Sequence, residues 1–118
     1  MVIRSRSFRK GRGKLDTVEL WLDGSAVGTV ALTGRDGAWF FGRFSPGPAF
    51  DRFGGVFRQW AGLMDLARQR PLSDVERRRL AAVEQSIDRL RPSVASSDGN
   101  RRPVWQLNID GDLIEWSE

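Results

Sequence analysis

The chain has 118 residues, a formal net charge of +4, and no cysteine, histidine or tyrosine. This length suffices for one hydrophobic core and is short for two. Without cysteine and histidine the chain can form neither a disulfide nor a His/Cys zinc site, and it lacks the thiol nucleophile and the commonest general base. We therefore expect one domain that acts through its surface, with no catalytic residues, cofactor or metal.

The positive charge is concentrated near the N-terminus. The basic residues before the first acid, Asp16, are Arg4, Arg6, Arg9, Lys10, Arg12 and Lys14. Residues 15–118 contain 13 arginines and 15 acids, a net of −2. The charge predicts a flexible basic arm over residues 1–14, whose six basic residues are candidate phosphate contacts, and a single domain over 15–118. An untethered tail without a binding role, or an organelle transit peptide, is the alternative for the arm.

No apolar run reaches the roughly 18 residues of a membrane helix, and the N-terminus has no apolar stretch typical of a secretory signal. These two observations favour a cytoplasmic protein without a membrane segment.

Three strands are predicted after the arm. Residues 17–22 and 26–32 are rich in strand formers and are joined by Asp23-Gly24, a strong hairpin signal, although a loop of two or four residues is possible. A second turn at residues 35–37 leads into residues 38–44. The three runs predict an antiparallel meander.

Two helices are predicted next. The prolines of residues 45–48 end the sheet, and large apolar residues then recur at helical spacing from 51 to 70, where Gly54 and Gly55 oppose the first turns. Pro71 ends this helix. Ser73 and Glu76 form a capping box for a second helix that runs toward Pro92, with an apolar stripe narrow enough to place it on the outside.

A polar loop over residues 93–102 precedes a final hairpin. With Asp110-Gly111 as its turn, Ile109 faces Asp112, and Trp105 faces Trp116 on the buried side. The complete order is β-β-β-α-α-β-β. It predicts an α+β fold with an antiparallel sheet of about five strands and two helices packed on one face.

Residues 36–50 read DGAWFFGRFSPGPAF, in which Asp, Trp, Gly-x-Phe-x-Pro and Phe follow one another at fixed spacing. Together with IDGDLIEW at 109–116, this run resembles a family of small uncharacterised bacterial proteins. The resemblance spans residues 20–116, with Ala38 where the family pattern has proline. It implies a fold and a bacterial source, and no activity.

Aromatic residues and arginines are densest between residues 39 and 58. Both are enriched at protein interfaces. The candidate contacts with a partner protein or a second copy are Trp39, Arg43, Phe44, Arg52 and Arg58. In the alternative, the phenylalanines of this region all turn inward and leave a polar surface.

Three functions follow from the composition and the arm. The first hypothesis is a non-catalytic binding or protein-interaction module. The second is a nucleic-acid-associated protein that uses the basic arm, and the third is an enzyme based on carboxylates. The alternating oxygen ligands at residues 108–112 do not predict a calcium site, because the glycine and the glutamate of an EF-hand loop are not at their positions.

Overall fold

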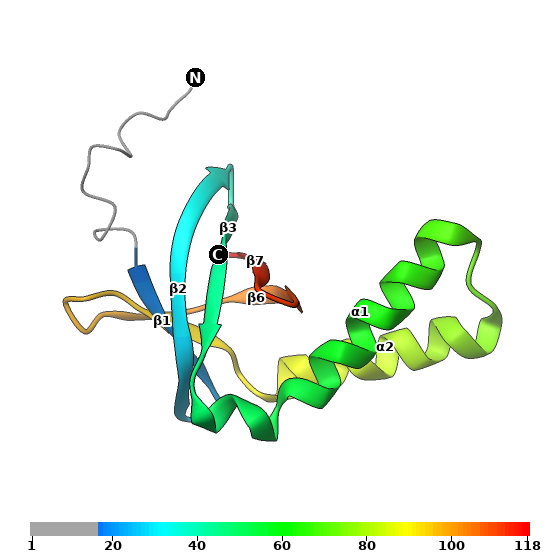
Figure 1. Cartoon of the computed structure of the whole chain (residues 1–118), viewed down its shortest axis with the longest axis horizontal. Helices are drawn as coiled ribbons and strands as arrows, with labels where there is room; N and C mark the ends of the chain where they lie inside the picture. Colours follow the sequence, from blue (N-terminus) through cyan, green and yellow to red (C-terminus); the bar gives the residue numbers. More distant parts are fainter. Residues whose placement is uncertain (1–16) are drawn as a thin grey trace.

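The computed structural model describes residues 17–118, so the six candidate phosphate contacts at positions 4–14 lie outside the described residues. In chain order the elements are β1 (Thr17–Leu22), β2 (Ser25–Asp36), β3 (Trp39–Pro46), the 3-10 helix η4 (Pro48–Arg52), α1 (Gly54–Gln69), α2 (Asp74–Arg89), β4 (Ser93–Ala95), β5 (Arg101–Pro103), β6 (Trp105–Asp110) and β7 (Leu113–Ser117). The fold is α+β, as predicted (Figure 1).

The sheet has seven antiparallel strands in the order β5-β4-β1-β2-β3-β7-β6, two more than expected. The additional strands, β4 and β5, form within the segment predicted as a polar loop. Each has three residues, and Val94 is the one fully buried side chain that they supply. So little apolar alternation gives no strand signal in the sequence.

The two edge strands of the sheet are neighbours in the chain. β5 and β6 lie at opposite ends of the strand order and are separated only by Val104. The N–H of Val104 donates to the carbonyl of Pro92 at 3.1 Å. A sheet whose opposite edges are one residue apart must curl strongly, and its concave side holds the core.

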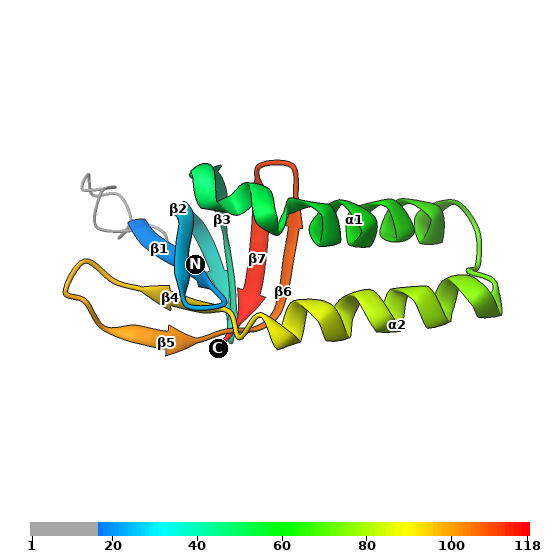
Figure 2. The same ribbon diagram turned by 90° about the horizontal axis from the view of Figure 1, so that it is seen from below.

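The helices form a hairpin that meets the sheet near β6 and runs away from it (Figure 2). Buried side chains occur only where the helices approach the sheet, at Phe57, Trp60 and Leu63 of α1 and at Val83 and Ile87 of α2. Residues 64–82 contain no buried residue. The helices therefore cover one face of the sheet with their inner ends only. Neither helix is long and apolar enough to cross a membrane.

Helix α1 begins three residues later than predicted, because Pro48 opens a 3-10 helix instead. A Cβ at Gly54 would lie 3.0 Å from Nη1 of Arg58 and 3.4 Å from Cε2 of Phe50, so the glycine permits close packing here. The capping box of α2 is present: the Ser73 side chain accepts from the N–H of Glu76, and the Glu76 side chain accepts from the N–H of Ser73.

The predicted turn of the last hairpin is wrong by one residue, which shifts the strand pairing by two residues. Asp110 pairs with Leu113, so the two-residue turn is Gly111-Asp112, and Ile109 faces Ile114 instead of Asp112. This register pairs two apolar side chains on the buried face, where the predicted one placed an isoleucine opposite a carboxylate.

The burial predicted for Trp105 is also wrong. Strand β6 has a bulge, in which two residues, Gln106 and Leu107, lie opposite the single residue Trp116. Gln106 has φ 53°, and Trp105 consequently pairs with Ser117. The extra residue keeps Leu107 on the buried face and turns Trp105 outward. Trp116 is completely buried, whereas Trp105 is 61% exposed.

Candidate functional site

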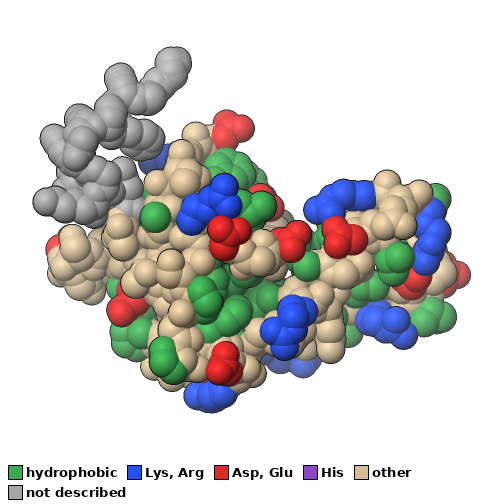
Figure 3. Space-filling model, viewed as in Figure 1, with side chains coloured by type: hydrophobic (Ala, Val, Ile, Leu, Met, Phe, Trp, Pro, Cys, Tyr) green, Lys and Arg blue, Asp and Glu red, His purple; other side chains and the backbone are tan. Residues whose placement is uncertain are grey.

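The predicted contact residues do not form one apolar surface. Phe44 is 3% exposed, so its side chain has no access to a partner. Arg43 pairs with Asp112 at 3.1 Å, and Arg52 lies 4.0 Å from Asp23. On the face seen in Figure 3, basic and acidic side chains are interspersed and no single charge sign gathers.

The phenylalanines of this region mostly turn inward. Phe44, Phe53 and Phe57 are buried, and the half-buried Phe50 joins two of them. Its ring meets Phe44 edge-on at 4.9 Å and stacks on Phe57 at 5.8 Å. The aromatic density of residues 39–58 is therefore largely explained by the core, which was the alternative to the interface hypothesis.

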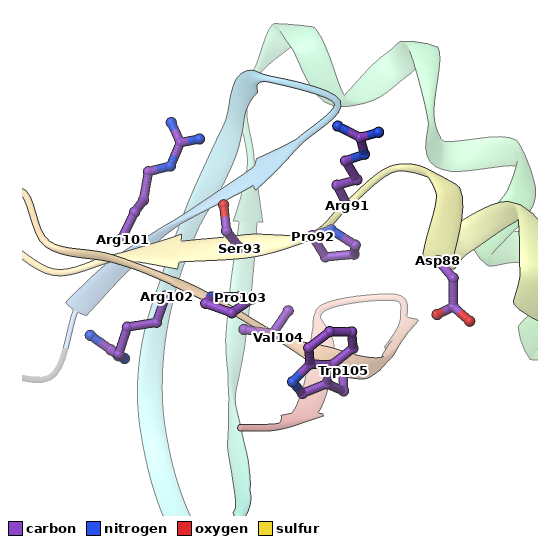
Figure 4. Close-up of a pocket in the computed structure, with 9 residues that line it drawn as sticks. All are labelled: Asp88, Arg91, Pro92, Ser93, Arg101, Arg102, Pro103, Val104 and Trp105. Atoms are coloured by element: carbon purple, nitrogen blue, oxygen red, sulfur yellow. The ribbon is translucent and has the colours of Figure 1, made fainter.

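Trp105 lies on a different surface and is the most exposed large apolar side chain of residues 17–118. It lines a hollow of about 480 Å³ where the end of α2, β4, β5 and the start of β6 meet (Figure 4). We call this the arginine–tryptophan hollow. Its lining residues are Asp88, Arg91, Pro92, Ser93, Arg101, Arg102, Pro103, Val104 and Trp105.

The hollow is predominantly basic, since three arginines and one aspartate line it. Arg91 and Arg101 have no carboxylate within 4.0 Å in the described part of the chain. Figure 4 shows the three guanidinium groups pointing apart, with Arg91 and Arg101 extending from the same side of β4. The arrangement suits an extended anion with several charges better than one enclosed phosphate.

Arg102 has a structural partner. Its Nε donates to Glu118 at 2.8 Å and its Nη1 donates to the Ser96 hydroxyl at 2.8 Å. Burial by itself would raise the pKa of Glu118, but hydrogen bonds from Arg102 and Trp116 outweigh it and hold the pKa below its ordinary value. This pairing leaves Arg91 and Arg101 as the cations of the hollow that can meet an external anion.

Local backbone geometry presents both Arg91 and Trp105. Arg91 follows the end of α2 with φ 50°, and Pro92, whose ring fixes its own φ, then leads into β4. Trp105 is turned outward by the bulge at Gln106. The sequence pattern predicts a buried Trp105 and therefore does not point to this site. The run RRPVW at residues 101–105 was the available signal, since it places a tryptophan beside arginines and a proline.

Arg101 also connects the hollow with the start of β1. Its guanidinium carbon lies 4.3 Å from the centroid of the Trp21 ring, a cation–π contact. Thr17, Trp21 and Arg101 line a neighbouring hollow of about 630 Å³. The basic residues at positions 4–14 precede Thr17 in the sequence and lie outside the described residues.

The site offers cations and a stacking surface. Residues 17–118 contain no buried charged or polar side chain and no group of three metal-ligating His, Cys, Asp or Glu residues. No protein-family model, curated protein or solved structure matches the chain.

Proposed function

We propose that the protein binds single-stranded nucleic acid at the arginine–tryptophan hollow. The observation that supports this most is Trp105, which is 61% exposed in a hollow lined by three arginines and one acid. A base stacked on an aromatic side chain gains about 1 to 3 kcal/mol, and arginines beside it neutralise phosphates.

The basic N-terminal segment supplies the second part of the binding surface. Residues 15–118 carry a net charge of −2, so the folded part alone attracts a polyanion weakly. Six positive charges precede Asp16, and Thr17 lines the same hollow as Trp21 and Arg101. A strand that reaches from Trp105 past Arg101 would come close to the point where the basic segment joins.

A protein partner is the second candidate, because exposed tryptophan and arginine are also the residues most enriched at interface hot spots. It would use the same hollow, since the surface around Arg43 and Arg52 lacks exposed phenylalanines. Both functions are compatible with the bacterial cytoplasm expected from the sequence.

Fluorescence anisotropy of labelled oligodeoxythymidylate with the full chain tests the proposal. We expect Trp105→Ala to weaken binding by about 5-fold to 150-fold. The double variant Arg91→Gln/Arg101→Gln should lower the slope of log K against log salt by about 1.4, because each phosphate contact to a single strand contributes about 0.7.

Arg78→Gln is the matched control, since Arg78 is an exposed residue of the first turns of α2 and does not line the hollow. It should bind like the unaltered chain. Deletion of residues 1–14 should remove most of the salt-sensitive affinity. Equal affinities for the unaltered chain and Trp105→Ala, or no binding at about 50 mM salt, would refute the proposal.

A further inference from the structure

A second hollow, of about 380 Å³, lies between β3, the two helices and β6. We call it the tryptophan–carboxylate hollow. Its lining residues are Trp39, Trp60, Met64, Glu84, Ile87, Asp88, Gln106, Leu107 and Asn108. No lysine or arginine is among them, so its charge is opposite to that of the arginine–tryptophan hollow. Asp88 lines both hollows.

The walls combine aromatic and acidic groups. Trp39, Trp60 and Met64 provide two indole rings and a thioether, which are polarisable apolar surfaces. The indole of tryptophan is the best aromatic partner for a cation, and the attraction strengthens when the cation is partly desolvated. Glu84 and Asp88 supply full negative charges at the same hollow.

The two carboxylates lack a cation of their own. Glu84 and Asp88 are four residues apart on α2, so they lie on one face of the helix, where like charges repel. Neither has an arginine or lysine within 4.0 Å in the part of the chain that the structure describes. From residues 17–118, Glu84 accepts a single long hydrogen bond, 3.4 Å, from Nε1 of Trp60. A cation placed between them would relieve the repulsion.

We infer that the tryptophan–carboxylate hollow binds an alkylammonium group. The ammonium would lie against the half-buried indole ring of Trp39 and beside the largely buried Trp60, with Glu84 and Asp88 neutralising its charge. The group has two possible sources, a lysine side chain of another protein or a small quaternary ammonium compound. The inference does not rest on nucleic-acid binding, because Glu84, Trp39 and Trp60 line only this one of the two hollows.

The test is a titration of the ¹⁵N-labelled full chain, followed through the indole Nε1–H signals of its tryptophans in ¹H–¹⁵N spectra. Choline represents a quaternary ammonium, and 3,3-dimethylbutan-1-ol is its uncharged isostere. N-acetyl-lysine methylamide represents a protein side chain. We expect at least one of the two cations to shift the Trp39 and Trp60 signals saturably, and the uncharged isostere to bind at least about 2-fold to 30-fold more weakly.

The cation that binds more tightly identifies the source. Equal binding of choline and its isostere would show that only apolar contact matters and would overturn the inference. Saturable shifts confined to tryptophans other than Trp39 and Trp60, or the lack of any shift with both cations, would also overturn it.

Glu84→Gln separates charge from shape, because glutamine keeps an oxygen that can accept from Trp60. It should weaken cation binding by about 2-fold to 30-fold and leave the isostere unchanged. Asp51→Asn, an exposed carboxylate of η4 away from this hollow, is the control and should have no effect. Unchanged cation affinity in Glu84→Gln would contradict the inference even if oligonucleotide binding is confirmed.

Discussion

The first and last hairpins of the sheet carry the same Asp-Gly pair, yet they turn at different residues. In the first, Asp23 and Gly24 are the turn, both with positive φ (51° and 78°), and Leu22 pairs with Ser25. In the last, Asp110 remains in its strand and the turn is Gly111-Asp112, with positive φ only at Gly111.

The difference shows that the turn dipeptide alone does not determine the register. The pairing that buries apolar side chains on one face of the sheet does. Both Asp-Gly and Gly-Asp suit two-residue turns, so a D-G-D sequence permits two registers. The observed one pairs Ile109 with Ile114, and the bulge then keeps Leu107 beside Trp116 in the core. In the first hairpin, the N–H of Asp23 donates to the carbonyl of Leu90 at 2.6 Å, a tertiary contact that holds the turn in place.

The largest expected effect is a difference in the free energy of unfolding between alanine variants of the two tryptophans of the last hairpin. Trp116→Ala should lower the free energy of unfolding by about 3 to 5 kcal/mol, because it empties a completely buried site against which Phe40 stacks at 5.7 Å. Trp105→Ala should change it by no more than about 0.5 kcal/mol, as exposed positions do. Urea denaturation measures both. Similar losses for the two variants would restore the register in which both rings face the core.

The sequence predicted the parts of the fold whose signals are local. The two helices, the capping box at Ser73 and the α+β class follow from spacing and turn chemistry. Strands β4 and β5 could not be predicted, because β4 is held by pairing with β1, which is distant in the chain, and β5 pairs only with β4. Only Val94 among their residues is fully buried.

The candidate site was not predicted for the same reason. Arg91, Arg101 and Trp105 were outside the proposed contact set, and they come together only because the opposite edges of the sheet meet at Val104. The exposure of Trp105 depends on a bulge that no local sequence pattern predicts. In contrast, Phe44 lies in the central strand β3, between β2 and β7, and alternates with the exposed Arg43, so its side chain faces the core.

A smaller effect should distinguish the two aspartates of the Asp-Gly pairs. Asp23→Ala should destabilise by about 1 kcal/mol, because alanine tolerates positive φ less well than aspartate. Asp110→Ala should stay within about 0.5 kcal/mol, since Asp110 is an exposed strand residue. Arg52→Gln controls for the contact of Asp23 with Arg52. Equal destabilisation by the two alanine variants in urea would place the last turn at Asp110-Gly111.

The turn between α1 and α2 is a third example, and here the predicted capping box is present in the structure. Side-chain hydrogen bonds hold this turn. Arg70 donates to both carboxylate oxygens of Glu76 at 2.8 Å, and the N–H of Ser73 donates to Oε1 at 2.9 Å. The guanidinium of Arg70, followed by the N–H of Ser73, lowers the pKa of Glu76 from 4.5 to about 2.

A lowered pKa stabilises the folded state when the carboxylate is ionised. The contribution of ionised Glu76 to the stability of the folded state is therefore complete above about pH 4.5 and is lost as the pH falls through about 2. A ¹³C titration of the Glu76 carboxyl should give a midpoint near 2, and Arg70→Gln should raise it while leaving it below 4.5, because Ser73 still donates. Arg77→Gln, which removes the pairing of Arg77 with Asp74 on the same helix, should leave the midpoint unchanged. A Glu76 midpoint near 4.5 in the unaltered chain would show that this turn is held by backbone geometry, like the two strand hairpins.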